Sequence, residues 1–244
     1  WRVNLSFILL IFAIVGVLKE KLPGKKYWLW FAAAFPFIAA WLLLGGLGLQ
    51  PVETSKLGGI LLTIIIGVTG ISFSLPIGIV LALGRRSNMP ALKTVCVLFI
   101  EFIRGVPLIT LLFVASTMLT YFLPPGSTFD LLMRVLIMVT LFSSAYIAEV
   151  VRGGLQGLPP GQYEAADSLG LTYWKAHRLI ILPQALKISI PGIVNTFIGL
   201  FKDTTLVLII GMMDIVGLGR ARLNDPYWLG LAGELYLFIA IFFF

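Results

Sequence analysis

The sequence predicts an all-α membrane protein, a polytopic helical bundle. Of its 244 residues, 59% are hydrophobic and 12% are charged, whereas soluble domains average about 45–50% apolar and about 25% charged residues. The apolar residues form long blocks, and a helix needs about 20 of them to cross a hydrocarbon layer about 30 Å thick. A soluble fold of this length could not bury so much apolar surface, because the core grows more slowly than the chain.

Seven apolar blocks are candidates for membrane spans. They lie at residues 4–18, 27–49, 57–84, 94–123, 131–151, 185–201 and 227–244. The stretch 185–216 has few breaks and would be about 48 Å long as one helix, which overshoots the bilayer. Lys202 and Asp203 lie in its middle. We therefore expect a span followed by a short re-entrant or interfacial segment at 204–213.

The basic residues predict the orientation of the chain. If the spans alternate, the segments 19–26, 85–93 and 152–187 fall on one side of the membrane, and they hold most of the Lys and Arg residues. Cytoplasmic loops carry such an excess, so we expect these segments in the cytoplasm. The same distribution explains the net charge of +7 without nucleic-acid binding. Three arginines do not follow the pattern, namely Arg134, Arg220 and Arg222.

The chain is expected to divide into two parts. Residues 1–52 form two additional N-terminal transmembrane helices, and residues 53–244 form the main transmembrane domain. The chain begins without an initiator Met and stops inside an apolar run, so we expect it to be cropped at both ends. The single Cys96 excludes an internal disulfide, and the single His177 excludes a metal site of several histidines. No metal site is expected.

The hydrophilic stretch 161–185, GQYEAADSLGLTYWKAHRLIILPQA, carries the pattern on which the predicted function depends. Gly170 suits the positive φ at the end of a helix, and Pro183 suits the first turn of the next one. We expect two short helices, 163–169 and 173–179, that form a rigid knob outside the membrane, followed by a helix that starts at Pro183. The residues that define the pattern are Glu164, Ala165, Ala166, Gly170, Ile180, Leu182 and Pro183.

Two interpretations of this stretch differ in what covers it. In the first, the two alanines let a partner backbone approach closely, and Glu164 pairs with a cation across the contact. In the second, Trp174, Lys175 and Arg178 hold the loop on lipid headgroups. The complete spacing of the pattern, rather than the three letters EAA alone, favours the first interpretation.

The complete spacing is identified as the EAA loop of ABC importer permeases. Residues 57–244 resemble the type I ABC transmembrane domain, specifically the polar amino-acid (histidine/glutamine/arginine) permease group. Val106 and Thr205 depart mildly from this group, which has Thr and Ser there. The N-terminal spans and the segment GLQPVETSKLGG are similar to the general L-amino acid subgroup. The stretches that carry the resemblance are EFIRGVPLI (101–109), AYIAEVVRGG (145–154), GQYEAADSLGL (161–171) and KDTTL (202–206).

This resemblance implies a fold, a location and partners. The fold is a type I core of five helices preceded by two extra ones, in the bacterial inner membrane, with the EAA loop in the cytoplasm. The implied function is import of polar or general L-amino acids. The implied partners are a cytoplasmic ABC ATPase dimer that docks on the EAA loop, a second permease subunit, expected to be a different homologue, and a periplasmic amino-acid-binding protein.

The sequence contains no G-x-x-x-x-G-K-[ST] phosphate loop, so we expect a partner to hydrolyse ATP. ATP and Mg²⁺ are then expected on the ATPase subunits, and no cofactor is expected on this chain. We do not expect the chain to be an enzyme, because its sequence offers no Ser/His, paired Asp or metal-ligand set.

Ionisable residues at membrane depth are costly and usually face a cavity or a partner. Glu101 and Arg104 are three residues apart, so they share a helix face and can pair. Gly105 and Pro107 then break the helix, and transporters place substrate sites at broken helices. The pair is a candidate for the substrate path, and the alternative is a pair that only fixes packing near the cytoplasmic interface.

A second set of candidates is Lys202, Asp203, Thr204 and Thr205. Their amine, carboxylate and hydroxyl groups suit the α-carboxylate and α-amino groups of an amino acid. They equally suit pinning the helix break and shaping a gate. Glu149 and Arg152, also three residues apart, are expected to form a snorkelling structural pair.

Two other functions remain as alternatives. A channel or proton-coupled secondary carrier would use membrane carboxylates such as Glu101, Glu149 and Asp203, but it leaves the EAA spacing unexplained. The second alternative is a permease for a different small solute. It would have the same architecture, since the binding protein, rather than the permease, does most of the selection among solutes.

Overall fold

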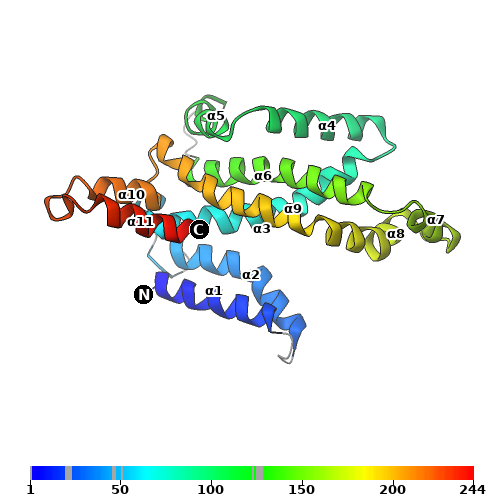
Figure 1. Cartoon of the computed structure of the whole chain (residues 1–244), viewed down its shortest axis with the longest axis horizontal. Coiled ribbons are helices and arrows are strands. Elements are labelled where there is room, and N and C mark those ends of the chain that lie inside the picture. The colour runs from blue at the N-terminus through cyan, green and yellow to red at the C-terminus, as the bar shows by residue number, and fades with distance from the viewer. Residues whose placement is uncertain (1, 20–23, 46–47, 51, 123, 125–128) are drawn as a thin grey trace. The chain divides into compact units, whose positions relative to one another are not determined.

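The computed structural model describes residues 2–19, 24–45, 48–50, 52–122, 124 and 129–244. Within these ranges the chain is helical and contains no β-strand (Figure 1), which confirms the predicted all-α class. The chain forms two compact units, Trp1–Leu57 and Gly58–Phe244. Parts of the predicted loops at 19–26 and 124–130 lie outside the described residues.

The N-terminal unit is a pair of antiparallel helices, α1 (Arg2–Leu18) and α2 (Lys25–Leu44). They pack closely where the ring of Trp28 lies against Gly16, and a Cβ on that glycine would collide with the ring. Gln50 follows α2 in the chain, and its carbonyl oxygen accepts a hydrogen bond from Nη1 of Arg2 at 2.7 Å. With 20 residues, α2 has the length of a membrane-crossing helix, whereas α1 with 17 residues is shorter.

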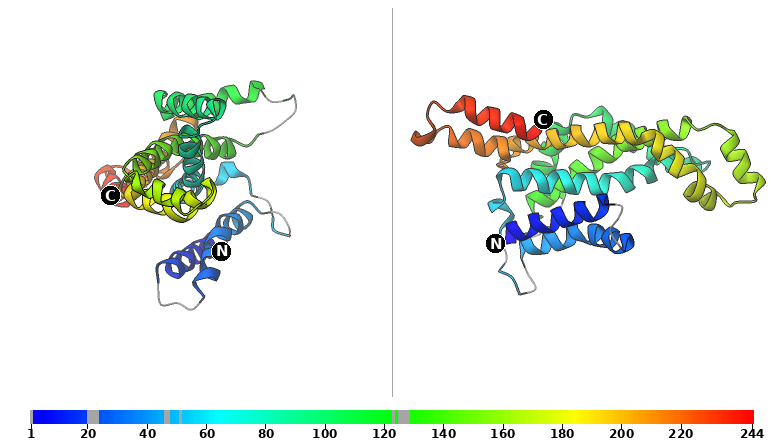
Figure 2. Two further views of the ribbon diagram at one scale, coloured as in Figure 1. Left: turned by 90° about the vertical axis from the view of Figure 1, so that its right-hand side faces the viewer. Right: turned by 60° about the horizontal axis from the view of Figure 1, so that its bottom comes forward.

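Three helices form the centre of the second unit: α3 (Gly59–Arg85), α6 (Leu131–Gln156) and α9 (Leu182–Asp203). They lie side by side in Figures 1 and 2. Among the described residues, these three helical stretches are long and apolar enough to cross a membrane, and α9 does so as part of the longer helical path Tyr173–Ile210. They coincide with the predicted spans at 57–84, 131–151 and 185–201.

Small residues allow these helices to approach one another. A Cβ on Gly78 would lie 2.5 Å from Cγ2 of Ile147, and one on Gly192 would lie 2.7 Å from Cγ1 of Val150. Ser189 of α9 donates to the carbonyl oxygen of Val150 at 3.1 Å. Helices in lipid associate by such close van der Waals packing and interhelical hydrogen bonds, because lipid chains are as apolar as the side chains.

The fourth predicted span, 94–123, is broken. Helix α4 (Pro90–Gly105) is followed by α5 (Leu108–Phe113), and the helical stretch Leu108–Met118, which α5 begins, is bent by 100° relative to α4. Val106 between them is extended, with φ −110° and ψ 131°, as expected for the residue before a proline. The predicted break at Gly105 and Pro107 is therefore confirmed.

Arg134 of α6 fastens the far end of this broken span. Its Nε atom donates to the carbonyl oxygen of Phe129 at 2.9 Å. Its Nη1 atom donates to the carbonyl oxygens of Ser116 at 2.7 Å and Ala115 at 3.4 Å. Both acceptors lie in a π-helical turn, Val114–Met118, that continues α5. This arginine thus bonds backbone carbonyls that the irregular turn presents.

The last part of the chain differs from its prediction. After α9 a 3₁₀ helix, Thr204–Ile210, ends at Gly211 with φ +87°, and α10 (Ile215–Arg222) follows. The expected final span at 227–244 is wrong in extent, because Gly230 with φ +88° delays the helix and α11 covers only Ala232–Phe243.

Replacing Gly154 by Leu tests the close packing of α6 and α9. A Cβ on Gly154 would collide with Ser189 and with the carbonyl of Ala185, whereas one on Gly153 meets nothing within 4 Å. We expect Gly154→Leu to destabilise the protein by about 1–3 kcal/mol through overpacking, and the control Gly153→Leu to have little effect. Thermal unfolding in detergent measures both, and equal midpoints would contradict this packing.

Candidate functional site

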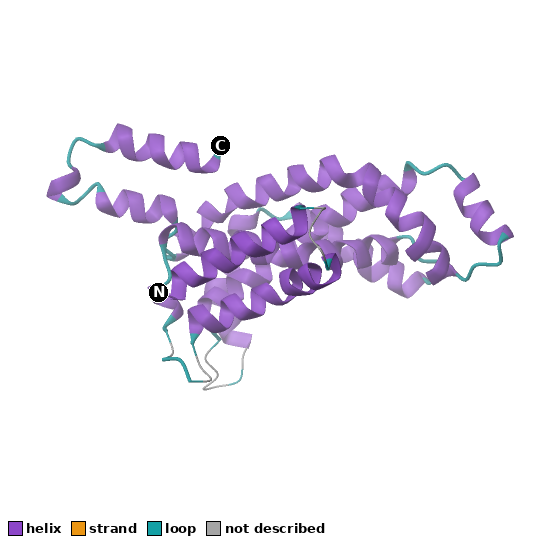
Figure 3. Cartoon of the chain, turned by 90° about the horizontal axis from the view of Figure 1, so that it is seen from below, coloured by secondary structure: helices purple, strands orange, loops and turns teal. Residues whose placement is uncertain are grey.

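The EAA stretch begins with α7 (Gly161–Ser168), which forms one end of the second unit (Figures 1 and 3). The helix ends in a Schellman motif. The N–H of Gly170 donates to the carbonyl of Asp167 at 2.9 Å, and the N–H of Leu171 donates to that of Ala166 at 3.2 Å. Gly170 has φ +65°, which confirms the predicted positive φ at this glycine.

The two faces of α7 differ in exposure. Glu164 and Ala165 are exposed, whereas Ala166 is only 1% exposed. Farther along the stretch, Leu169, Trp174 and Leu179 are exposed apolar side chains. Ile180 and Leu182 pack against the buried core of α3, α6 and α9. The stretch is therefore anchored on its inner side and offers a mixed apolar and acidic surface on its outer side.

Helix α9 begins at Leu182 with Pro183 in its first turn, as predicted. The expected break before it is absent, because the helical path is continuous from α8 (Tyr173–Ala176) to Ile210. A π turn, His177–Ile181, precedes the proline. There the N–H of Leu182 bonds the carbonyl of His177, five residues back. A proline has no N–H to donate. The wider π turn ends just before Pro183, so the proline lies where the hydrogen bonds return to the α-helical pattern.

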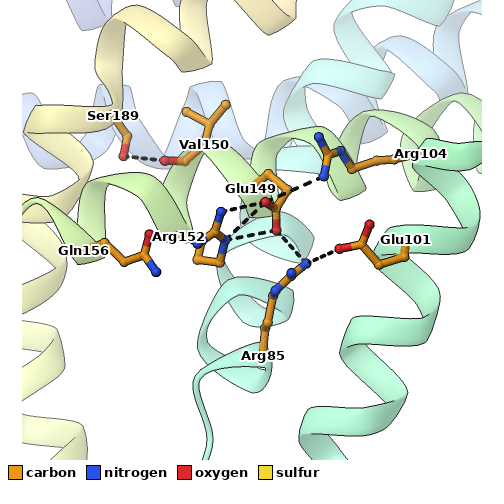
Figure 4. A network of polar contacts seen from close by, with 8 residues as sticks. All are labelled: Arg85, Glu101, Arg104, Glu149, Val150, Arg152, Gln156 and Ser189. Atoms are coloured by element: carbon orange, nitrogen blue, oxygen red, sulfur yellow. Dashed lines mark hydrogen bonds and ion pairs between the residues drawn. The ribbon is translucent and has the colours of Figure 1, made fainter.

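Five charged residues form a cluster where α3, α4 and α6 meet (Figure 4). Glu149 is its centre. One of its oxygens lies 2.7 Å from Arg85 Nη1, and the other lies 2.9 Å from Arg152 Nη2 and 3.6 Å from Arg104 Nη1. Arg85 Nη1 also lies 2.8 Å from Glu101 Oε1. We call Arg85, Glu101, Arg104, Glu149 and Arg152 the ion cluster.

The ion cluster confirms one predicted pair and corrects the other. Glu149 and Arg152 are paired as expected. Among the ion pairs of the described residues, however, Glu101 bonds Arg85 instead of Arg104, and Arg104 turns to Glu149. The guanidinium of Arg104 also lies 5.6 Å from the ring centroid of Tyr146, a cation–π geometry. Sequence spacing reveals partners only along one helix, so it missed these contacts between helices.

Burial makes Glu149 the residue on which the ion cluster depends. Its side chain is 15% exposed, compared with 54% for Glu101. A charge withdrawn from water is tolerated when it is paired and hydrogen-bonded. Three guanidinium groups meet Glu149, so its carboxylate holds α3 and α4 against its own helix, α6.

The residues 202–205 do not lie with the ion cluster. Leu200 of α9 meets Gly70 of α3, whereas Ile147 of α6 meets Gly78. Gly70 and Gly78 are eight residues apart on α3, and Lys202 and Glu149 each lie two residues beyond their contact, in opposite directions. At about 1.5 Å per residue, these twelve steps place Lys202 and Glu149 about 18 Å apart along the bundle axis. The two sets of candidate residues therefore occupy different levels of the bundle.

Within residues 202–205, the hydroxyl groups form hydrogen bonds, whereas the charged groups form no ion pair with the described residues. Thr204 donates to the carbonyl of Phe201 at 2.7 Å, and Thr205 donates to that of Lys202 at 3.0 Å. These bonds pin the turn from α9 into the 3₁₀ helix. Lys202 is exposed and Asp203 half-buried, and neither takes part in an ion pair in the described part of the chain.

Residues 74–244 match the family described as binding-protein-dependent transport system inner membrane component. The chain belongs to this family. Members of this family are transport components, which confirms the predicted transport function. They are not enzymes, which confirms that the chain is not one either. The resemblance to amino-acid ABC permeases is confirmed as well, because relatives and a solved structure are named as amino-acid ABC transporters or their permeases.

Two relatives match nearly all of the chain. The permease protein BztC of Rhodobacter capsulatus, named for glutamate/glutamine/aspartate/asparagine transport, is 59% identical over 96% of this chain and 57% of its own length. The inner membrane amino-acid ABC transporter permease protein YhdY of Escherichia coli is 52% identical over the whole chain and 67% of its own length. The chain thus spans between about half and two thirds of these relatives.

Solved structures support the fold. A crystal structure of an amino acid ABC transporter with histidines is 32% identical, with a TM-score of 0.65 over 76% of this chain and 84% of that one. A methionine ABC transporter in an inward-facing conformation is 20% identical, with a TM-score of 0.57, and it supports the fold alone.

Neutralising Glu149 tests its central place in the ion cluster. In Glu149→Gln, three guanidinium groups lose their shared carboxylate. We expect a loss of stability between the at most about 1 kcal/mol of an exposed pair and the about 3–5 kcal/mol of a broken buried pair. Glu101→Gln is the control and is expected to cost less. Unfolding in detergent measures both, and a larger loss for Glu101→Gln would contradict the assignment.

Proposed function

We propose that this chain is the membrane-spanning permease subunit of an ATP-driven importer for polar or general L-amino acids. The observation that carries the proposal is the EAA-spaced stretch, folded as a short helix with an exposed outer face at one end of the bundle. Membership in the binding-protein-dependent transport family supports it. The names of BztC and YhdY support amino acids as the substrate class.

The coupling of transport to ATP hydrolysis is assigned to the EAA loop. Glu164 and Ala165 offer the exposed contact surface, and Gly170 fixes the end of α7. The buried Ala166, with Ile180 and Leu182, ties the loop to the bundle, and Pro183 lies in the first turn of α9. A cytoplasmic ABC ATPase dimer, which holds ATP and Mg²⁺, is the proposed partner. A second permease subunit, a different homologue, and a periplasmic amino-acid-binding protein complete the assembly.

The EAA loop faces the cytoplasm of a bacterial inner membrane in this proposal. Helix termini and loops at its end of the second unit carry a group of basic residues, as cytoplasmic loops do. These residues are Arg85, Arg86, Lys93, Arg152, Lys175, Arg178 and Lys187.

The two sets of candidate residues receive different roles. Glu101 and Arg104 already have partners in the ion cluster, so we assign them to a gate at the cytoplasmic end of the path. Lys202 and Asp203 present opposite charges without an ion pair between them, beside the hydroxyls of Thr204 and Thr205. This combination suits the α-carboxylate and α-amino groups of an amino acid, so we assign the second set to the substrate path.

Uptake by proteoliposomes tests the proposed function. The chain is reconstituted with its ATPase, second permease and binding protein, and accumulation of labelled amino acids is measured. We expect strict dependence on ATP and on the ATPase subunit. Uptake by the chain alone would support a channel or secondary carrier instead. Ligand profiling of the binding protein identifies the solute, and a ligand other than an amino acid would refute the substrate class.

Charge reversal in the EAA loop tests the coupling assignment. Glu164→Lys is expected to abolish ATP-driven uptake, because the ammonium group that replaces the exposed carboxylate repels the cationic partner. Glu234→Lys in α11 is the matched control, since Glu234 is also exposed and lies in the first turn of its helix. Uptake and co-purification of the ATPase are the measurements. Normal uptake by Glu164→Lys would refute the coupling role of this residue.

A further inference from the structure

Two adjacent arginines at the end of α3 reach different partners. Arg85 lies in the ion cluster, where Nη1 contacts Glu101 and Glu149. Arg86 instead donates from Nη1 to Tyr163 Oη of α7 at 3.1 Å. We propose that Arg86 and Tyr163 are positioning residues that pass a displacement of α7 to the ion cluster through the end of α3. The inference rests on the proposed function, in which an ATPase moves α7.

Tyr163 is held on several sides by the bundle. The Arg86 guanidinium lies 5.6 Å from its ring centroid, so a cation–π contact accompanies the hydrogen bond. The Tyr163 hydroxyl in turn donates to the carbonyl of Leu155 near the end of α6 at 3.2 Å. Its ring also meets His177 edge-on at 6.3 Å. One side chain of α7 therefore touches the ends of α3 and α6 and the start of the long helix that contains α9.

The inner and outer sides of α7 are adjacent in sequence. Glu164 and Ala165 are exposed, whereas the two preceding residues bond to the bundle: Tyr163 to Arg86, and Gln162 to Gln184 of α9 at 2.8 Å. A force applied to the exposed residues thus acts on two side chains that bond α3 and α9. The bond to α3 leads to the ion cluster, because the next residue back is Arg85.

The end of α3 is stiff enough to carry this displacement. The N–H of Arg86 bonds the carbonyls of Leu83 and Gly84 as the helix cap, and neighbouring Cα atoms stay about 3.8 Å apart. Gly84 lies directly against Cys96 of α4, with no room for a Cβ. Because the ion pairs of Arg85 measure 2.7 and 2.8 Å, a shift of about 1 Å takes them beyond normal hydrogen-bond length.

The arrangement also fits a plain structural role, in which Arg86 only fixes the loop. A structural role predicts that loss of the contact lowers stability, ATP hydrolysis and uptake together. The proposed link predicts a separation of the two activities, since α7 remains docked and moves while the ion cluster no longer follows. The ratio of amino acid transported to ATP hydrolysed distinguishes these roles.

The experiment uses the complete reconstituted transporter with Tyr163→Phe and Arg86→Gln. Tyr163→Phe removes only the hydroxyl and keeps the ring. We expect both variants to retain ATP hydrolysis and a normal unfolding midpoint, while transport per ATP falls about fivefold or more, the lower end of typical coupling effects. The double variant should be no worse than the more severely affected single variant, because each change alone already breaks the hydrogen bond between Arg86 and Tyr163. Lys93→Gln, an exposed cation in the first turn of α4, is the control.

Each outcome decides between the possibilities. If the unaltered transporter shows no ATP-driven uptake, the proposed function itself fails. If it transports and the variants keep its transport-to-ATP ratio, only the link through Arg86 is overturned. A proportional loss of hydrolysis and uptake with a lower unfolding midpoint assigns the contact a structural role and also overturns the link. Transport lost with hydrolysis and midpoint retained supports it.

Discussion

The carboxylate of Glu149 is the constraint on which the second unit depends. It lies where three apolar helices meet, and three guanidinium groups converge on it from α3, α4 and α6 itself. A charge in such surroundings persists because its partners are in place, so the pairing also determines where each helix end lies. The same cluster begins one residue before the contact between α3 and α7. Stability and the path toward the EAA loop therefore share one set of side chains.

The parts of the fold that depend on local properties could be predicted from the sequence. Long apolar blocks predict α3, α6 and α9, and the break between α4 and α5 follows from Gly105 and Pro107. Gly170 predicts the end of α7, since its positive φ is a property of that residue. Contacts between helices could not be predicted in this way, because Arg85 is separated from Glu149 by 64 positions (149 − 85). Pro183 does mark the first turn of α9, but the π turn that joins α9 to α8 has no simple sequence signal and could not be predicted.

The candidate residues separate into two levels of the bundle that differ in how their charges are bonded. In the ion cluster every charge has an opposite partner on another helix or one turn away, which suits an element that opens and closes. At 202–205 the hydroxyls bond the backbone of their own helix, and none of the ion pairs among the described residues involves Lys202 or Asp203. Family membership supports the transport role of both levels. Their different bonding supports separate gate and substrate roles.

The bonding of Arg134 bears on how membrane topology is deduced from charge. Its guanidinium is engaged by three peptide oxygens, those of Ala115, Ser116 and Phe129, at the end of the bundle remote from the EAA loop. A guanidinium group whose N–H donors are bonded to backbone carbonyls in this way is attracted only weakly to anionic lipid headgroups. It can therefore be retained at this end of the bundle at small cost. Counts of loop charge therefore predict membrane topology better when arginines that bond irregular helix turns are left out.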